Sequence, residues 1–322
     1  LLLFSLVQTI CNFHVKTINL HTFQSIIMIV RAHIFLIMAC ILWSFNPVAN
    51  KIALVEIAVP QLVFMRTFLS AIILLTVTFC MGYSFRLKQI GWRPFLLGVL
   101  DPGLTSLLFV TSLTLVSVSN TVLVMALMPF SQPILARLVL KEEVQSSVWF
   151  GAVFVLFGFS IFFLGEQIIN KDSLLGNVLL LTVFGLMTFS QLLTRKIMLT
   201  EISTFVVTSS QMVSATVIMF FNLIFFGNLE LPFQASSGTI MTFVYLVFSL
   251  AIPFFLYNQA MRHIPVGMAS LFLVLVIPLG FLWAAIFMGE EITLLKITGA
   301  VLVMIGVVLP HLLQLGIKRY SI

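Results

Sequence analysis

Charged residues are scarce in this chain. Of its 322 residues, 8% are Asp, Glu, Lys or Arg and 61% are hydrophobic, and the mean hydropathy is +1.20. A soluble globule of this length could not cover its surface with so few polar groups. The shortage excludes an ordinary soluble protein and indicates an integral membrane protein.

Signatures of covalent and metal chemistry are also missing. The three cysteines follow no CxxC or Cys/His spacing, which argues against a disulfide framework and a zinc site. No Walker A sequence and no GxSxG occurs, so the sequence offers no ATP-hydrolysing site and no nucleophile elbow. We expect no enzyme activity, no metal site and no cofactor.

What the sequence does contain is a series of long apolar runs. A bilayer core needs about 20 apolar residues per helix. Charges, Pro and Gly divide the chain into ten such segments, approximately 33–54, 61–83, 94–115, 118–140, 146–165, 173–194, 203–226, 238–260, 266–288 and 293–315. Residues 1–30 are predicted to form an N-terminal tail, for which an upstream artefact is an alternative, and residues 317–322 a cytoplasmic tail.

The basic residues behind the net charge of +6 lie singly or in short groups between the apolar runs. Nucleic-acid binders gather theirs on one solvated face, so nucleic acid is not an expected partner. With the N-terminus inside, twelve Lys and Arg fall on the cytoplasmic side and three outside, which is the bias of cytoplasmic loops. We predict a multi-pass protein of the cytoplasmic (inner) membrane, surrounded by membrane lipids, with both termini cytoplasmic. A homodimer stays open.

One stretch of the chain occurs twice. LKEEVQSSVWFGAVFVLFG, residues 140–158, and MGEEITLLKITGAVLVMIG, residues 288–306, share paired acids and two glycines at a constant offset of 148 residues. A fixed offset indicates an internal repeat, here residues 31–166 and 167–316. Because five helices per repeat is an odd number, the second copy enters the membrane from the opposite side. We therefore predict an all-α integral membrane protein whose ten transmembrane helices form two inverted five-helix repeats.

The repeat suggests a structural role for its acids and glycines. Each acid pair precedes the last helix of a repeat, where unpaired N–H groups and the helix dipole favour an anion. Two catalytic pairs on opposite faces of a membrane would serve no common site. The glycines lie seven residues apart on one helix face and would admit close packing. The residues predicted to be structural here are Glu142, Glu143, Glu290, Glu291, Gly151 and Gly299.

Two further segments carry a family resemblance. LWSFNPVANKIAL contains Trp43, Ser44, Asn46 and Lys51, Arg66 follows in the second helix, and LYNQAMRHIPVGMASL contains Asn258, Ala260, Ile264 and Pro265. In this order, and with the duplicated block, the chain resembles the EamA-type carriers of the drug/metabolite transporter superfamily from about residue 34 to 313. The resemblance implies a ten-helix, two-repeat carrier that moves small organic molecules, often outward. Pro47 and Asp101-Pro102-Gly103 depart from the family pattern.

Several polar side chains inside the segments are candidate substrate ligands. Asn46, followed by Pro47, offers either a polar notch or a kink satisfied by neighbouring helices. Tyr257 and Asn258 could orient a ligand or bond helices together. Pro129 and Pro278, matched at an offset of 149 residues, point either to a central binding region beside Gln132 or to kinks that shape packing.

Arg66 and Asp101 are the charges placed deepest in the predicted helices. A charge there costs about 2.5–3.5 kcal/mol, and their depths leave about 9 Å between them along the membrane normal. A pair, or two separately satisfied charges, that only holds adjacent helices together is one interpretation. Since Asp101 aligns with Leu250, repeat symmetry does not require its charge. We predict that Asp101 binds a proton or a cationic group of the substrate and that Arg66 orients or neutralises it.

These observations favour a secondary transporter that works by alternating access on a small organic metabolite or drug, with export preferred. An intramembrane aspartyl peptidase is the rival from another class, but it needs two carboxylates in one site. A channel or a non-transporting membrane scaffold is a further alternative.

Overall fold

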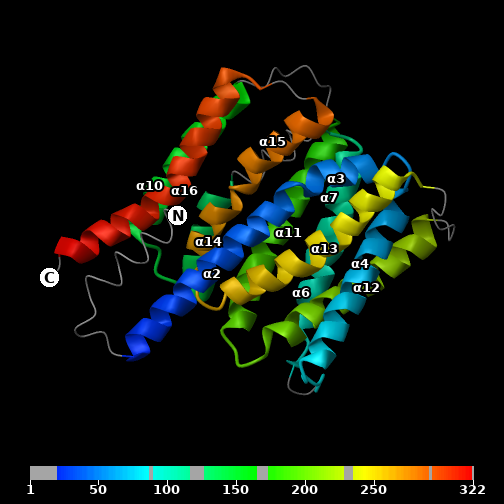
Figure 1. Ribbon diagram of the computed structural model, residues 1–322, viewed down its shortest axis with the longest axis horizontal. Helices are drawn as coiled ribbons and strands as arrows, with labels where there is room; N and C mark the ends of the chain where they lie inside the picture. Colours follow the sequence, from blue (N-terminus) through cyan, green and yellow to red (C-terminus); the bar gives the residue numbers. More distant parts are fainter. Residues whose placement is uncertain are drawn as a thin grey trace.

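The computed structural model describes residues 20–86, 90–116, 127–164, 173–227, 235–289 and 292–320. All regular elements in these ranges are helices, and they pack into one bundle (Figure 1). The elements are α2 (Leu20–Ser44), α3 (Asn46–Ala53), α4 (Val59–Cys80), α6 (Arg93–Gly98), η1 (Val99–Leu104), α7 (Thr105–Leu113), α9 (Met128–Leu135), η2 (Ala136–Leu140), α10 (Ser146–Leu164), α11 (Leu174–Met198), α12 (Thr204–Phe226), α13 (Ser237–Ala260), α14 (Val266–Leu273), α15 (Val276–Met288) and α16 (Leu294–Tyr320).

Seven stretches of helix within the described residues are long and apolar enough to cross a membrane. They are Ile27–Ala53, Val59–Cys80, Arg93–Leu113, Leu174–Met198, Thr204–Phe226, Ser237–Ala260 and Val266–Met288, and Ser146–Ile161 and Leu294–Pro310 are shorter apolar helices. Each corresponds to a predicted segment. The remaining segment, 118–140, is described only from residue 127, as α9 and η2. The prediction of an all-helical, multi-pass membrane protein is confirmed.

The first and last described helices, α2 and α16, extend beyond the ends predicted for their segments. α2 begins at Leu20, inside the predicted N-terminal tail, because residues 20–33 contain no Pro or Gly that would end a helix. α16 continues to Tyr320, beyond the predicted end of its segment. Residues 1–19 and 321–322 lie outside the described ranges.

Prolines interrupt three of the spanning stretches. α2 stops at Ser44 and α3 resumes at Asn46, because Pro47 has no N–H to continue the ladder. A two-residue turn before Pro278 separates α14 from α15 in the same way. In η1, Asp101 precedes Pro102 and has extended dihedral angles, φ −143° and ψ 116°, as a residue before proline prefers. Such interruptions are tolerated in a membrane where they face protein or a cavity.

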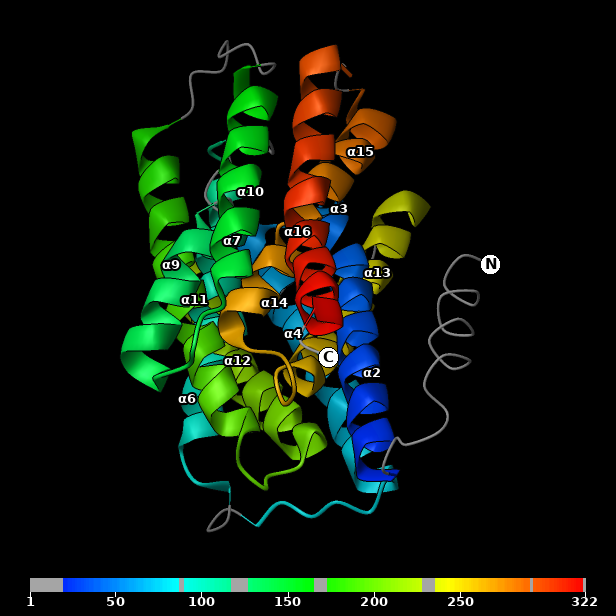
Figure 2. The same ribbon diagram turned by 90° about the vertical axis from the view of Figure 1, so that its left-hand side faces the viewer.

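Glycines bring α10 and α16 into close contact at one edge of the bundle, where Figures 1 and 2 show the two helices side by side. A Cβ atom on Gly151 would lie 2.5 Å from the Gly306 carbonyl oxygen, and one on Gly158 would lie 2.8 Å from that of Gly299. The earlier glycine of α10 meets the later glycine of α16, and the later one meets the earlier, so the two helices are antiparallel. No larger side chain fits at these positions without separating the helices.

Glu142 links one end of the bundle. Its Oε1 forms a 2.6 Å ion pair with Arg195 at the end of α11, and its Oε2 accepts a 3.0 Å hydrogen bond from the Val266 N–H at the start of α14. Arg195 also donates to the Met261 carbonyl at 2.6 Å. We call these four residues the Glu142 latch.

The latch corrects a detail of the predicted capping. Glu142 was placed at the start of the following helix, α10, whereas it meets the N-terminus of α14. The chain turns after η2 through Lys141, which has a left-handed φ of 56°, and Glu142 pairs with Arg195 on α11. Glu143 is exposed, and Glu290 and Glu291 lie outside the described residues.

A second set of polar contacts joins segments at the opposite end of α13. The exposed Glu56 carboxylate accepts hydrogen bonds from the Ser236 N–H at 2.6 Å and from its hydroxyl at 2.7 Å. Ser236 is the N-cap of α13. These bonds, the hydroxyl bond above all, lower the pKa of Glu56 below its ordinary value.

Candidate functional site

A cavity of about 130 Å³ lies inside the bundle. Ten of its lining residues come from the first repeat and eleven from the second. They are Trp43, Asn46, Pro47, Arg66, Asp101, Pro102, Thr105, Ser106, Phe109 and Met128, with Val183, Met187, Gln191, Thr194, Gln211, Leu250, Phe254, Tyr257, Asn258, Leu273 and Val276. The structure thus brings five of the six predicted ligand residues, all except Gln132, to one cavity.

Arg66 is held by a chain of amides and hydroxyls that crosses four helices. Its guanidinium donates to Asn50 Oδ1 at 2.8 Å and to the Ser106 hydroxyl. Asn50 donates to Asn46 Oδ1 at 2.5 Å, and Asn46 donates to the Ser249 hydroxyl at 3.1 Å. The Arg66 side chain is only 2% exposed. Charge-assisted hydrogen bonds of this kind offset part of the cost of a buried cation.

Asp101 has hydrogen-bond partners of its own. Thr105 donates its hydroxyl to Asp101 Oδ1 at 2.6 Å, and Gln211 Nε2 donates to the Asp101 backbone carbonyl at 2.7 Å. That carbonyl is accessible to a side chain because the extended conformation at Asp101 interrupts the helical ladder. Asn258 then donates to Gln211 Oε1 at 2.9 Å and to the Thr208 hydroxyl at 2.9 Å.

The direct ion pair considered for Arg66 and Asp101 is not formed between these two described residues. Each charge is satisfied separately, Arg66 by Asn50 and Ser106 and Asp101 by Thr105. Both still line the same cavity. The arrangement leaves a cation and an anion facing one small volume, where a ligand can meet both.

Three buried polar atoms of the lining residues have no hydrogen-bond partner in the described part of the chain: Arg66 Nε, Tyr257 Oη and Asn258 Oδ1. An unsatisfied buried polar atom costs about 1–3 kcal/mol. These atoms are therefore candidates for contact with a ligand. Beside them, Trp43 packs edge-on against Phe254 and, tilted, against Tyr257, with ring centroids 5.3 and 5.7 Å apart.

Gln132 lies behind the cavity wall and not in it, which corrects its predicted position. Its Nε2 donates to Oε1 of Gln191, which does line the cavity. α9 carries Gln132 as well as Pro129, and neither Pro129 nor Pro278 reaches the cavity. Pro278 instead lines a separate groove between α15 and α16.

Sequence reasoning missed several members of the site, chiefly Gln191 and Gln211 on α11 and α12, together with Asn50, Thr194 and Ser106. The signal that could have found the glutamines is an amide in the middle of an apolar span, since polar groups there face the bundle interior. Both are buried, with exposed fractions of 4% and 1%.

The chemistry of the site is that of a binding cavity. Twelve of its 21 lining residues are aromatic, aliphatic, Pro or Met, and the other nine supply amides, hydroxyls and two opposite charges. Sites for small organic molecules have such a mixture of apolar walls and placed polar groups. No group of three His, Cys, Asp or Glu side chains that could hold a metal ion occurs in the described ranges.

Comparisons with known proteins agree with this arrangement. One solved structure, described only as "Crystal structure of protein", has a TM-score of 0.73 and 15% identity, over 88% of this chain and 98% of its own. At this identity the likeness shows the fold alone. A comparison with curated proteins found no match. The sequence model of the EamA-like transporter family matches residues 30–164 and 174–310. Since these two matches cover most of the chain, one in each repeat, the chain belongs to the EamA-like transporter family.

Proposed function

We propose that this protein is a secondary transporter that carries a small organic molecule through the cavity by alternating access. The single observation behind the proposal is the cavity itself, because residues of both repeats line it and it gathers buried polar atoms that have no hydrogen-bond partner among the described residues. Transporters built from inverted repeats bind substrate at such an interface. The proposal includes ten spanning helices, with the segment that contains α9 and η2 as the fourth.

The lining residues themselves follow the repeat. Six pairs of them are separated by 148 residues, the offset of the duplicated block: Trp43/Gln191, Asn46/Thr194, Pro102/Leu250, Ser106/Phe254, Phe109/Tyr257 and Met128/Val276. Equivalent positions of two copies surround one cavity when the copies are related by an axis that passes through it. This pairing supports a cavity on the axis between the repeats.

The contact of α10 with α16 supports an inverted relation. Gly151 meets Gly306, which is equivalent to Gly158, and Gly158 meets Gly299, which is equivalent to Gly151. Such reciprocal contacts are characteristic of a two-fold axis. If α10 and α16 both cross the membrane, as the proposal has it, their antiparallel packing puts that axis in the membrane plane, as in inverted repeats.

The two ends of the bundle provide contacts that a transport cycle would make and break. The Glu142 latch joins the first repeat to the ends of α11 and α13 and to the start of α14 in the second. In the proposed cycle, this end opens when the latch separates, and the end at Glu56 and Ser236 closes and opens in alternation with it. Rigid-body movement of one repeat against the other would produce both changes.

In this scheme Asp101 binds a proton or a cationic group of the substrate, and Arg66 fixes an electronegative group. Repeat symmetry does not account for Asp101, because its counterparts at offsets of 148 and 149 residues are Ser249 and Leu250. A charge present in only one repeat suggests a role in binding or coupling and not in the fold. Intramembrane charges are functional candidates in general.

We also propose that the Glu142 end faces the cytoplasm, in the inner membrane, and that the usual direction is export. The excess of Lys and Arg on this side supports the orientation. A reporter fused after Arg319 should then report cytoplasm and one inserted near Lys171 the exterior. Opposite results at both sites would contradict the orientation.

An intramembrane enzyme is less well supported. Within the part of the chain that the structure describes, Asp101 is the one carboxylate that lines the cavity, whereas an aspartyl peptidase needs two that share a site.

Cells provide the test of transport. Intracellular and extracellular small molecules would be compared in cells that lack the protein, produce it, or produce Asn258→Leu. Expected is a compound whose export requires the intact protein and is lost with Asn258→Leu at normal membrane abundance. Thr298→Ala, an exposed position on α16, is the matched control and should export normally. If Asn258→Leu and the intact protein export the compound equally, the substrate does not pass through this cavity.

A further inference from the structure

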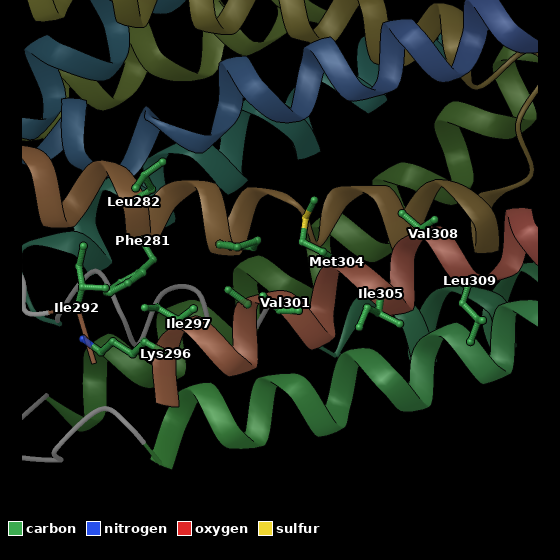
Figure 3. A pocket seen from close by; sticks show the side chains of 12 residues that line it. Phe281, Leu282, Ile292, Lys296, Ile297, Val301, Met304, Ile305, Val308 and Leu309 are labelled. Carbon is green, nitrogen blue, oxygen red and sulfur yellow. The ribbon is translucent and has the colours of Figure 1, made fainter. Parts of the chain in front are cut away.

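The central cavity differs from the groove between α15 and α16 in the polar groups that it offers. Figure 3 shows the groove, whose lining residues are apolar except for Lys296. The central cavity has nine polar lining residues, and four of them, Asp101, Thr105, Gln211 and Asn258, belong to one hydrogen-bonded set. The directions of the hydrogen bonds in this set limit what the cavity can bind.

Gly98 brings α12 close enough for Gln211 to reach Asp101. A Cβ atom on Gly98 would lie 1.9 Å from the Gln211 backbone carbonyl oxygen, so only a residue without a side chain lets α6 and α12 approach this closely. Gln211 then bonds the Asp101 backbone carbonyl, which is available because the extended conformation at Asp101 interrupts the helix. The contact joins the second repeat to the break in the first.

The direction of each bond in this set is determined by its partners. A backbone carbonyl can only accept, so the Gln211 atom that lies 2.7 Å from the Asp101 carbonyl oxygen must be the amide nitrogen. Gln211 therefore presents its Oε1 to Asn258, which must donate from Nδ2 across 2.9 Å. The orientation of both amides follows from an acceptor that cannot be reversed.

Thr208 independently fixes the Asn258 amide in the same direction. Its hydroxyl donates its one proton to the Thr204 carbonyl at 2.9 Å, so its oxygen accepts the second N–H of Asn258, also at 2.9 Å. Both protons of Asn258 Nδ2 are thus engaged. The Asn258 side chain is buried, and its Oδ1 has no partner among the described residues. Asn258 therefore offers a ligand an acceptor and no donor.

Asp101 adds a second acceptor, which is charged. Its carboxylate lines the same cavity, receives one bond from Thr105, and is joined to Asn258 through the single side chain of Gln211. A group that satisfies a carboxylate and an amide oxygen together needs a positive charge and at least two hydrogens to donate. A primary ammonium has both, whereas a quaternary ammonium has the charge and no hydrogen on its nitrogen.

Arg66 sets the opposite requirement in the same cavity. A guanidinium only donates, and two of its nitrogens bond Asn50 and Ser106, which leaves Nε–H without a partner in the described ranges. A hydroxyl or carbonyl oxygen of a ligand can accept from it. The two requirements together determine which end of a ligand lies toward Asp101.

We propose that Gln211 is a positioning residue that determines specificity: it holds Asn258 as an acceptor, so that the cavity selects a primary ammonium over a quaternary one. The inference rests on the proposed function, because it assigns a chemical class to the substrate, a small primary amine that also carries an oxygen acceptor. Aromatic contacts alone would select differently, since Trp43, Phe254 and Tyr257 line the cavity and aromatic rings bind quaternary ammonium groups. The preference between the two ammonium types therefore separates the two kinds of recognition.

Binding to the purified full-length protein in lipid nanodiscs tests the proposal. The probes are phenylethanolamine and its N-trimethylated derivative at neutral pH, where both carry one positive charge. Expected is about tenfold tighter binding of phenylethanolamine, the effect of one net hydrogen bond. Gln211→Met keeps the length of the side chain and removes its bonds, so the preference should fall about threefold, since Thr208 still holds one proton of Asn258 Nδ2. Gln259→Met makes the same change beside Asn258 at a residue that does not line the cavity and should keep the preference.

Three results would overturn the proposal: tighter binding of the trimethylated probe, equal binding of the two probes, and binding of neither. An unchanged preference in folded Gln211→Met would overturn the role of Gln211.

A measurement on the unaltered protein guards against variants that fail to fold. The NMR signal of the Asn258 side-chain amide, identified by its loss in Asn258→Leu, should show both N–H protons hydrogen-bonded and slow to exchange with solvent. Both should stay so when phenylethanolamine binds, because the ligand meets Oδ1. A fast-exchanging Asn258 proton, or one released from its bond by phenylethanolamine, would show that the amide is not fixed as an acceptor.

Neither measurement requires transport, so the two proposals can fail separately. A protein that binds the probes with the expected preference but exports nothing contradicts the transport proposal alone. A protein that exports a compound, loses that export with Asn258→Leu, and binds both probes equally contradicts this inference alone.

Discussion

Replacement of Asp101 by Asn tests the proposed coupling with little disturbance of the fold. Thr105 donates to a side-chain oxygen of Asp101, and Asn offers a carbonyl oxygen of the same shape. The bond from Gln211 goes to the backbone and does not involve the side chain. The change should therefore cost only the difference between a charged and a neutral acceptor, about 1 kcal/mol, and the protein should reach the membrane.

The number of carboxylates in the cavity sets the expected magnitude. Asp101 is the one carboxylate among the described residues that line it, so we expect a transport cycle to carry at most one proton on a lining acid. One pH unit is worth about 1.36 kcal/mol, which corresponds to a tenfold concentration ratio. A gradient of one pH unit should thus drive up to about tenfold accumulation of the substrate by the unaltered protein. Asp101→Asn should give a ratio of about one.

Proteoliposomes allow the two activities to be separated. Once the export comparison has identified a substrate, its accumulation is measured with an imposed pH gradient, and its exchange without one. Asp101→Asn should keep exchange and lose accumulation. Glu143→Gln makes the same charge change at an exposed position outside the cavity and serves as the matched control. Normal pH-driven accumulation by Asp101→Asn would refute the reasoning.

Three further predictions follow from contacts outside the cavity. Glu142→Gln removes the charge that faces Arg195, so the free energy of unfolding should fall by about 1–3 kcal/mol. A cysteine placed at a cavity position should then react faster with a thiol reagent added from that end. Unchanged labelling would argue against a latch. Gly151→Ala puts a Cβ 2.5 Å from the Gly306 carbonyl oxygen and should destabilise the protein by about 1–3 kcal/mol. Gly185→Ala, whose Cβ meets nothing within 4 Å, should not destabilise it. Equal thermal midpoints of the two variants would contradict this packing. For Glu56, the hydrogen bonds from Ser236 lower the pKa in the folded state below the ordinary value of 4.5. The stability it contributes is therefore present above pH 4.5 and lost as the pH falls through the lowered value, so the unaltered protein should lose its stability advantage over Glu56→Gln in acid; an advantage that persists there would exclude this origin.

The sequence indicated which charged residues face the cavity, but it did not indicate which side chains they bond to. Arg66 and Asp101 were placed deep in the bundle and near one another along the membrane normal, and both line the cavity. Their partners, Asn50, Ser106 and Thr105, were not predicted. Rise per residue gives depth directly, but the direction of a side chain also depends on the tilt and rotation of each helix.

The prolines show the same difference between a local effect, which was predicted, and a position in the packed bundle, which was not. The sequence predicted an interruption at Pro47, because a missing N–H has a local effect, and the helix is broken there. Matched Pro129 and Pro278 suggested a common binding region, yet neither lines the cavity. Whether a break faces a ligand or a lipid depends on the neighbouring helices.

The sequence by itself determined that this is a helical membrane protein with a duplicated unit. Too few polar residues exist to cover a soluble surface, and a bilayer permits few alternatives to apolar helices of spanning length. Only the tertiary structure decided that Gln191 and Gln211 belong to the site, that Glu142 binds the start of α14, and that Lys296 lies at the end of an apolar groove. These contacts join residues far apart in the chain, and they exist only once the helices have packed, since packing sets the rotation and tilt that aim each side chain.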